Sequence, residues 1–207
     1  EKKSLENEII PKLIKKNKVT GQIIKNKFFL DIGTPHYFRK SSKILKNLFS
    51  KPAVFFDRDN TIIKDDGYIY KVKDLKFIRK SIEAIKFLIK KNYYIFLVTN
   101  QAGIAKGFFK EEDFFKFQEA MKLRMRKNKI YFNDIEYCPY HPKAIIKKYK
   151  KKTQLRKPGN MMIKNLEKKW LIKKNESFMI GDSITDKLAA KKSNIYFEYP
   201  KENLFLQ

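Results

Sequence analysis

Acidic residues follow two apolar runs of the sequence, at the point where each run ends. Asp57 and Asp59 come after AVFF, and Asp182 and Asp186 come after FMIG. Short apolar runs predict buried strands, and the carboxyl ends of parallel strands meet at the sheet edge where α/β proteins bind ligands. Close carboxylates repel each other unless a cation lies between them, and Mg²⁺ prefers oxygen ligands. The sequence therefore predicts a magnesium site at this edge.

Further polar residues are expected at the same edge. The apolar run YIFLV ends in Thr99 and Asn100, and the basic pair Arg156 and Lys157 stands just before a predicted helix. Carboxylates, hydrogen-bond donors and a lysine together suit phosphoryl transfer, in which catalysis is mainly positioning and neutralisation of charge. Phosphoryl transfer is therefore the chemistry that these residue types predict.

The predicted catalytic residues are Asp57, Asp59 and Lys157. Asp57 attacks phosphorus and becomes an aspartyl phosphate, while Asp59 protonates the leaving alcohol and later deprotonates the hydrolytic water. Lys157 stabilises the charge on the nucleophile and the phosphate. Thr99 and Asn100 hydrogen-bond the phosphoryl oxygens.

The predicted metal ligands come from the same acidic residues. Asp182 completes the Mg²⁺ site with Asp57 and the backbone carbonyl of Asp59. Asp186 lies one helical turn beyond Asp182, and we expect it to orient neighbouring groups.

The elements that must position these residues alternate along the chain from residue 51. Apolar runs predict strands over 53–56, 94–98, 135–137, 178–180 and 195–199. Periodic segments predict helices over 79–91, 111–127 and 158–169, and one from about 186. Strands separated by helices of this length predict right-handed crossovers. The expected fold is α/β, with a three-layer, Rossmann-like parallel sheet.

The first fifty residues predict a small appendage made of a helix, a β-hairpin and a second helix. The helix spans 4–16 with Ser4 as its N-cap. The hairpin pairs 19–24 with 27–33, and the second helix begins at Pro35 after Thr34. These residues hold too little apolar material for an independent domain.

Lysine dominates the charge of the chain. Its 48 Lys and Arg against 22 Asp and Glu give a formal net charge of +26, which invites a nucleic-acid interpretation. However, the lysines are scattered, and only KKYKKK at 147–152 forms a dense cluster. Arginine, the usual reader of phosphates and bases, is scarce. The composition therefore favours small anionic substrates over nucleic acid.

Cysteine content and hydropathy limit the cellular context. Cys138 is the single cysteine, which excludes an internal disulfide and suits a reducing cytoplasm. The longest apolar run, 93–98, is too short to cross a bilayer. We therefore predict a cytoplasmic protein without a membrane partner.

The motifs taken together resemble those of the haloacid dehalogenase superfamily of phosphatases. They are D-x-D-x-T at 57–61, Thr99-Asn100 after a hydrophobic strand, Lys157, and G-D-x-x-x-D at 181–186. The resemblance covers 53 to about 199 and implies the fold, the Mg²⁺ ion and the aspartyl-phosphate mechanism.

Within the superfamily, the chain most resembles the D-glycero-D-manno-heptose 1,7-bisphosphate 7-phosphatases and their histidinol-phosphatase relatives. The phrases that carry this resemblance are DRDNTI, DGYIYKVKDLKFI, VTNQAGIAKGFF, YCPYHP and LRKPG. The resemblance places Gln101, Lys106 and Arg156 around the substrate.

The chain departs from these relatives at two places. Asn60 stands where glycine is usual in the first motif; asparagine also tolerates a left-handed backbone. The relatives carry a zinc loop of the form Cys-x-His followed by Cys-x-Cys. Cys138 remains, His141 is one residue out of register, and the other three positions hold Tyr140, Thr153 and Leu155. One thiol and one displaced histidine do not make a tetrahedral site, so we expect no zinc.

The N-terminal segment resembles the C-terminal end of sugar-phosphate nucleotidyltransferase domains. The resemblance rests on the phrase F-x-D-I-G-T-P, here Phe29 to Pro35, and the glycine-rich nucleotide loop of that family is absent. It implies that 1–50 is the remnant of such a domain, fused to a phosphatase domain over 51–207. The two halves would serve consecutive steps in making a nucleotide-activated heptose.

The leading prediction is therefore removal of the 7-phosphate of heptose 1,7-bisphosphate. A phosphatase for histidinol phosphate or another small molecule is one alternative. A polynucleotide-directed phosphatase or a basic nucleic-acid-binding protein is the other, and KKYKKK is its main support.

Overall fold

The computed structural model describes residues 4–25, 29–30 and 32–200. The chain divides into two compact units, Glu1–Leu45 and Lys46–Gln207. No helix in the described part of the chain is both long and apolar enough to cross a membrane.

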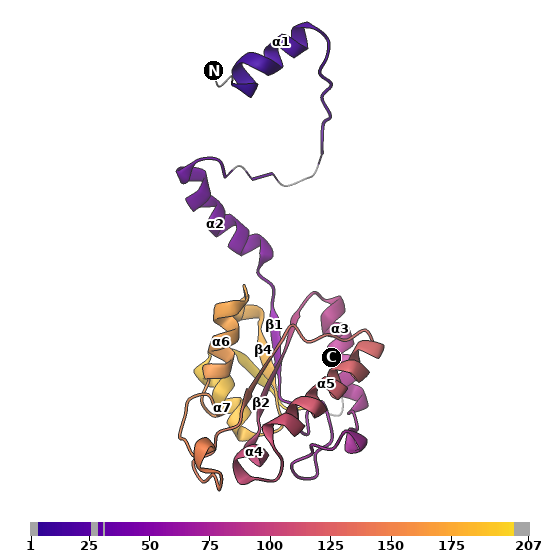
Figure 1. The fold of residues 1–207 in the computed structure, drawn as a ribbon, viewed down its shortest axis with the longest axis vertical. Helices are drawn as coiled ribbons and strands as arrows, with labels where there is room; N and C mark the ends of the chain where they lie inside the picture. The colour runs from indigo at the N-terminus through magenta and orange to yellow at the C-terminus, as the bar shows by residue number, and fades with distance from the viewer. Residues whose placement is uncertain (1–3, 26–28, 31, 201–207) are drawn as a thin grey trace. The chain divides into compact units, whose positions relative to one another are not determined.

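The larger unit is built on a five-stranded parallel sheet in the order β3-β2-β1-β4-β5 (Figure 1). The strands are β1 (Ala53–Phe56), β2 (Tyr94–Asn100), β3 (Asp134–Cys138), β4 (Phe178–Ile180) and β5 (Tyr196–Glu198). Every strand pair in this order is parallel. The α/β class and the parallel sheet predicted from the sequence are thus confirmed.

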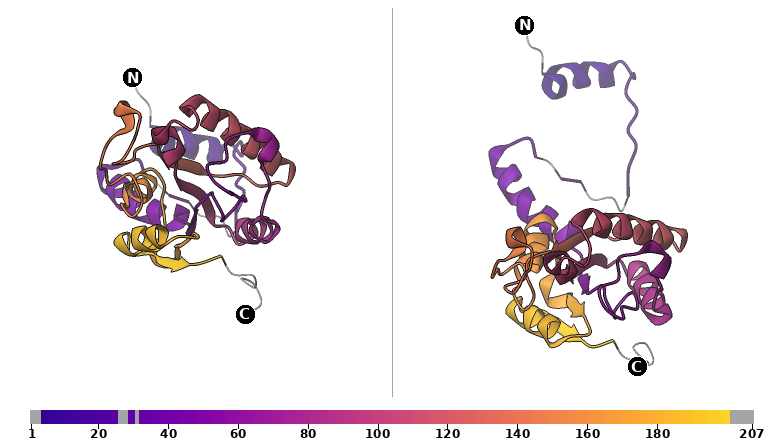
Figure 2. Two further views of the ribbon diagram at one scale, coloured as in Figure 1. Left: turned by 90° about the horizontal axis from the view of Figure 1, so that it is seen from below. Right: turned by 60° about the horizontal axis from the view of Figure 1, so that its bottom comes forward.

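Helices cover both faces of the sheet, which makes three layers (Figures 1 and 2). The long helices are α3 (Arg79–Lys90), α5 (Glu111–Lys127), α6 (Met161–Lys169) and α7 (Ile184–Lys192). Shorter elements are α4 (Ala102–Lys106), η2 (Val72–Asp74), η3 (Lys147–Tyr149) and η4 (Lys174–Glu176). Helices α3 and α5 pack on one face, and α6 and α7 pack on the other.

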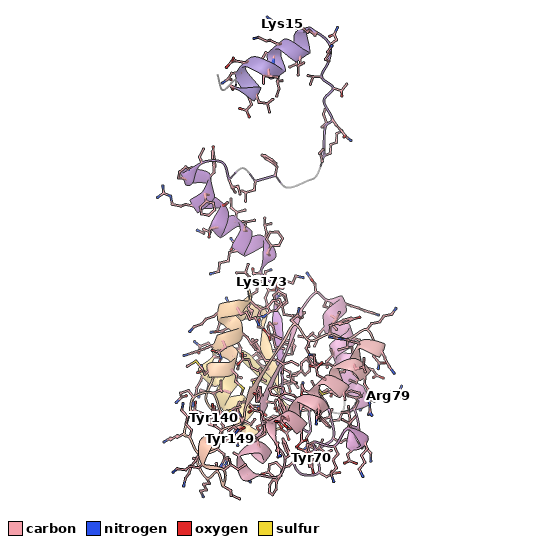
Figure 3. The ribbon with its side chains drawn as sticks, in the orientation of Figure 1. Lys15, Tyr70, Arg79, Tyr140, Tyr149 and Lys173 are labelled. Carbon is pink, nitrogen blue, oxygen red and sulfur yellow. The ribbon has the colours of Figure 1, made fainter. Side chains whose placement is uncertain are left out.

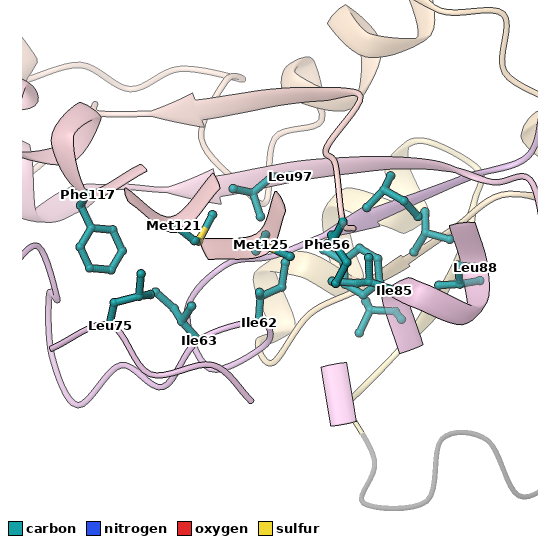
Figure 4. Packing of buried hydrophobic residues seen from close by; sticks show 14 residues of the cluster. Phe56, Ile62, Ile63, Leu75, Ile85, Leu88, Leu97, Phe117, Met121 and Met125 are labelled. Atoms are coloured by element: carbon teal, nitrogen blue, oxygen red, sulfur yellow. The ribbon is translucent and has the colours of Figure 1, made fainter. Parts of the chain in front are cut away.

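Strand β1 is apolar throughout because it has a core on each side. Val54 and Phe56 belong to the cluster with α3 and α5, whereas Ala53 and Phe55 belong to the cluster with α6 and α7. Side chains alternate between the two faces of a strand, so a central parallel strand needs apolar residues at every position. Figure 4 shows the first cluster, in which Phe56 lies among residues of α3 and α5.

Two helices begin at other residues than predicted. Helix α6 begins at Met161 rather than Pro158, because Gly159 N–H bonds the carbonyl of Arg156 at 2.7 Å and so closes a turn before the helix. Helix α7 begins at Ile184 rather than near Asp186. Ser183 caps it, and Asp186 completes a capping box from inside the first turn.

The smaller unit contains helical segments with the predicted caps. A π-helical turn, η1 (Leu5–Ile9), leads into α1 (Ile10–Lys15), and the Ser4 hydroxyl accepts the N–H of Asn7 at 3.2 Å. Helix α2 (Pro35–Phe49), which begins in this unit and ends beyond Leu45, follows Thr34, whose hydroxyl accepts the N–H of Tyr37 at 3.3 Å.

The predicted hairpin is absent from the described residues of this segment. Residues 17–25, 29, 30 and 32 contain no strand. The second strand predicted for this hairpin includes Lys27, Phe28 and Asp31, which lie outside the described residues. Two strands alone are marginally stable in water and need a third strand or a helix to cover them. An alternating sequence pattern is therefore not sufficient for a hairpin to form.

Candidate active site

The polar residues that follow β1, β2 and β4 lie at one edge of the sheet. Phe56 pairs with Leu97 of β2 and with Ile180 of β4, so β1 and β4 end at the same level, and β2 continues for three residues to Asn100. Asp57 continues this register, since its N–H bonds the carbonyl of Ile180 at 2.9 Å. The parallel sheet therefore brings together residues that are more than a hundred positions apart in the chain.

Lys157 is the buried cation of this edge, with only 3% of its side chain exposed. Its Nζ lies 2.6 Å from Asp57 Oδ1, 2.6 Å from Asp186 Oδ1 and 2.9 Å from the carbonyl of Val98. Burial alone would lower the pKa of Lys157, but Asp57 and Asp186 together hold it above its usual value. The ammonium group is therefore charged and fixed between two carboxylates.

Asn100 holds the backbone of Lys157 in place. Its Oδ1 accepts the Lys157 N–H at 3.0 Å, and its Nδ2 donates to the Lys157 carbonyl at 3.1 Å. A side-chain amide can satisfy both backbone groups of one residue in this way because it carries a donor and an acceptor side by side. The end of β2 thus sets the position of the lysine directly.

Three carboxylates converge beside Lys157. Asp57, Asp182 and Asp186 each offer an oxygen, and these oxygens lie within 4.8 Å of one another. Burial and the negative charge of Asp186 together raise the pKa of Asp57 to about 7, against the opposing charge of Lys157. Burial and the charge of Asp186 also raise the pKa of Asp182. One lysine leaves this set with an excess of negative charge, which suits a hard divalent cation.

Asp186 lies closer to the centre than the sequence indicated. It is fully buried, and its carboxylate approaches Gly181 so closely that an added Cβ there would lie 2.5 Å from it. Glycine at 181 is thus required for the approach. Asp186 both caps α7 and belongs to the carboxylate cluster, whereas the Asp59 side chain points into a different network.

That network joins Asp59 to the end of β2. Arg58 Nε donates to Asp59 Oδ1 at 2.7 Å, and Gln101 Nε2 donates to Asp59 Oδ2 at 2.9 Å. Gln101 also accepts from Arg58 at 3.0 Å and donates to the hydroxyl of Thr99 at 2.8 Å. Both oxygens of Asp59 are therefore fixed by donors.

Arg58 is a site residue that the sequence did not single out. It is 1% exposed, and its guanidinium carbon lies 5.6 Å and 5.1 Å from the ring centres of Phe114 and Phe117. A buried arginine is costly unless it is paired, and here it pairs with Asp59. Its position between the two aspartates of D-x-D was the available signal.

Lys106 and Arg156 lie on segments beside this edge. Lys106 Nζ donates to the hydroxyl of Tyr68 and lies 4.9 Å from its ring centre, while Tyr68 packs against Phe108. Burial lowers the pKa of Arg156, and its Nη1 is buried with no hydrogen-bond partner among the described residues. An arginine nitrogen in this state can take up an anionic group without breaking an existing bond.

The two departures from the family pattern have local explanations in the structure. Asn60 adopts a left-handed backbone with φ 51°, and its Oδ1 accepts the N–H of Asp65 at 3.0 Å. Cys138 is buried, with Sγ 3.8 Å from the carbonyl of Tyr140. His141 Nδ1 accepts the N–H of Lys143 at 3.1 Å. Among the described residues, the acidic cluster around Asp57 is the group with metal-ligand spacing.

A parallel α/β sheet with carboxylates after β1 and β4, and a buried lysine between them, defines a phosphatase of the haloacid dehalogenase type. The family model described as "Polynucleotide kinase 3 phosphatase" matches residues 52–203. The chain therefore belongs to this family of haloacid dehalogenase phosphatases.

Relatives of known name are similar over most of their length. The D-glycero-beta-D-manno-heptose-1,7-bisphosphate 7-phosphatase of Photorhabdus laumondii is 42% identical over 70% of this chain and 77% of its own. That of Pasteurella multocida is 38% identical over 70% of this chain and 78% of its own.

Solved structures show the same fold. A crystal structure from Mesorhizobium loti, described as a HAD-like phosphatase, has a TM-score of 0.67 and 25% identity, and the match covers 70% of each chain. The heptose 1,7-bisphosphate phosphatase of B. bronchiseptica, solved with magnesium and phosphate, has a TM-score of 0.64 and 22% identity. That match covers 71% of this chain and 79% of the other.

Proposed function

We propose that this phosphatase removes the 7-phosphate of D-glycero-D-manno-heptose 1,7-bisphosphate in a Mg²⁺-dependent reaction. The named relatives support the substrate, since they carry that activity in their names and are 42% and 38% identical to this chain. The observation that carries the chemistry is the pairing of Lys157 with Asp57 beside two further carboxylates.

In the proposed mechanism Asp57 is the nucleophile. One of its oxygens attacks phosphorus, the bond to the sugar oxygen breaks, and Asp59 donates the proton that this oxygen needs. Asp59 then takes a proton from the water that hydrolyses the aspartyl phosphate. Lys157 orients the nucleophile and favours its ionised form, because it stays charged at 2.6 Å from Oδ1.

The metal ligands of the proposal are Asp57, Asp182, Asp186 and the backbone carbonyl of Asp59. A bound Mg²⁺ would supply neutralisation of charge on the phosphoryl oxygens. The carboxylate cluster supports this assignment because its three oxygens lie within 4.8 Å of one another. Asp186 joins the predicted ligands because its carboxylate lies in that cluster.

The remaining site residues bind the substrate in this proposal. Thr99 and Asn100 hydrogen-bond the phosphoryl group, and Asn100 also fixes Lys157. Gln101 orients Asp59 and Thr99. Lys106 and Arg156 bind the rest of the anionic sugar phosphate, and the unpaired buried Nη1 of Arg156 supports that role.

Phosphate release from a panel of substrates tests the proposal. Heptose 1,7-bisphosphate should give the highest kcat/KM, ahead of histidinol phosphate, other sugar phosphates and a 3′-phosphorylated oligonucleotide. Asp57→Asn is the inactive control variant, because it removes the nucleophilic oxygen with little change in shape. Preference for histidinol phosphate would reject the substrate assignment.

A polynucleotide substrate is the second candidate. It is favoured by the name of the matching family model and by the basic segment around η3. It predicts binding to DNA or RNA that weakens steeply with salt, whereas the heptose proposal predicts activity with a shallow salt dependence.

We also propose that the N-terminal unit is part of a nucleotidyltransferase-like domain and that the protein acts in the cytoplasm. The resemblance of the sequence phrase from Phe29 to Pro35 and the capped start of α2 support the first point, and the single cysteine supports the second.

A further inference from the structure

A long loop, residues 139–157, connects β3 to the turn before α6 and brings Arg156 and Lys157 to the site. Its regular structure is the single 3-10 turn η3. A loop of this length loses much conformational entropy when it is ordered, so residues at its end are held accurately only if contacts anchor it.

One carboxylate anchors this loop to both α5 and β3. The hydroxyl of Tyr149, in the loop, donates to Glu111 Oε2 at 2.8 Å. The hydroxyl of Tyr137, in β3, donates to Glu111 Oε1 at 2.6 Å. Glu111 is the first residue of α5. We call Glu111, Tyr137 and Tyr149 the tyrosine clamp.

Further contacts tie the clamped loop to α4. The N–H groups of Ile145 and Ile146 both bond the carbonyl of Ala105, at 3.0 Å and 3.1 Å. Tyr149 is 6% exposed, and its ring centre lies 6.2 Å from that of Tyr140 in the same loop. The two residues are labelled next to each other in Figure 3. Helix α4 ends at Lys106, so these backbone bonds link the loop that carries Arg156 to the helix that carries Lys106.

The chemistry of the clamp makes it rigid. Hydrogen bonds from a hydroxyl to a carboxylate are shorter and stronger than those between neutral groups. Burial raises the pKa of both tyrosines, and their bonds to Glu111 raise it further, so both remain donors over the working pH range. Glu111 also lies in the first turn of α5, where an acidic side chain interacts favourably with the helix dipole.

Lys157, in contrast, has anchors of its own. Asn100 holds its backbone, and Asp57 and Asp186 hold its ammonium group. Arg156, one residue earlier, has no such partner for its Nη1 among the described residues. Loosening the loop should therefore disturb Arg156 and leave Lys157 in place.

We propose that Glu111, Tyr137 and Tyr149 are positioning residues that hold Arg156 and Lys106 at the separation needed by a second anionic group of the substrate. The inference rests on the proposed function in that the second group is taken to be the remaining sugar phosphate. It predicts an effect on substrate affinity and none on the phosphoryl-transfer step.

Steady-state kinetics of Tyr149→Phe and Tyr137→Phe test the clamp, because each change removes one hydroxyl and keeps the ring. KM for heptose 1,7-bisphosphate should rise about fivefold to tenfold in each variant, since one charge-assisted hydrogen bond is lost. Its kcat should stay within twofold. Both constants for p-nitrophenyl phosphate, which lacks a second anionic group, should also stay within twofold.

Tyr131→Phe is the matched control. Tyr131 is 60% exposed and lies just before the amino end of β3, whereas the site lies at the carboxyl ends of the strands. Hydrogen exchange gives a readout that needs no substrate: peptides covering 145–150 should exchange about tenfold faster in Tyr149→Phe than in wild type. Peptides of the central strand β1 should not change.

The outcomes separate the clamp from the proposed function. An unchanged KM together with unchanged exchange at 145–150 overturns the clamp, as does an equal fall of kcat on both substrates. Wild-type enzyme that ignores heptose 1,7-bisphosphate but turns over another bisphosphorylated sugar overturns the proposed substrate only. The clamp then predicts the same rise in KM for that sugar.

Discussion

Replacing Lys157 with methionine should destabilise the folded protein, because it removes the buried cation that partly neutralises the carboxylates at the centre of the site. Methionine is similar in length but carries no charge, so Asp57 and Asp186 each lose a partner at 2.6 Å. Removing one partner from a buried ion pair typically costs about 3–5 kcal/mol, because the remaining charge stays buried and unpaired. We expect a loss of that size in the free energy of unfolding of metal-free protein at pH 8.

The pH dependence of this loss follows from the carboxylates. Burial already raises the pKa of Asp57 to about 7, and removing the opposing charge of Lys157 raises it further. An acid whose pKa is higher in the folded state binds more protons there, so it stabilises the fold at low pH and loses this effect as pH rises. The penalty of Lys157→Met should therefore be small at pH 5 and largest at pH 8.

Urea unfolding followed by circular dichroism, with EDTA present, measures this effect at both pH values. Lys164→Met is the matched control, since Lys164 lies exposed on α6 and should change stability by less than about 0.5 kcal/mol. A Lys157→Met variant as stable as wild type at pH 8 would refute the view that the lysine neutralises buried carboxylates.

Four other predictions concern the same site. Asp57→Asn should abolish phosphate release while its circular dichroism spectrum stays that of wild type, and residual turnover would remove Asp57 as the nucleophile. Because protonated Asp57 must lose its proton to bind a cation, the rise in Tm caused by Mg²⁺ should grow between pH 6 and pH 8, and calorimetry that finds the reverse contradicts the ligand assignment. Gly181→Ala should weaken Mg²⁺ binding about tenfold or more in titrations, since its Cβ would lie 2.5 Å from the Asp186 carboxylate. Metal analysis of the purified protein should find no stoichiometric zinc, and one zinc per chain would disprove the prediction that the loop after Cys138 has no zinc site.

Local pattern in the sequence was enough to predict a parallel sheet and the succession of its strands and helices along the chain. Strand β1 is apolar at each position because both faces are covered, and a buried run ended by an aspartate is visible without any tertiary information. The same holds for helix caps such as Ser4 and Thr34, whose partners lie within three residues. The absence of the predicted hairpin from the described residues has the converse cause, since a strand needs a neighbour that local sequence does not specify.

The partners of the site residues, in contrast, depended on the tertiary structure. The sequence indicates that Asp57, Lys157 and Asp182 belong to one site, because strand ends converge in a parallel sheet. It does not indicate that Asn100 holds the Lys157 backbone, or that Gln101 fixes Asp59. These bonds join residues far apart in the chain, and their geometry depends on how whole elements pack.

Asp186 and the tyrosine clamp illustrate the same division. The spacing of Asp182 and Asp186 is a local fact, but the approach of Asp186 to Lys157 requires α7 to begin at Ile184 and glycine to stand at 181. In the sequence, Glu111 is recognisable only as an acidic residue at the start of the helix predicted over 111–127. Its two tyrosine partners come from β3 and from a loop, and only the packing of α5 against both places them together.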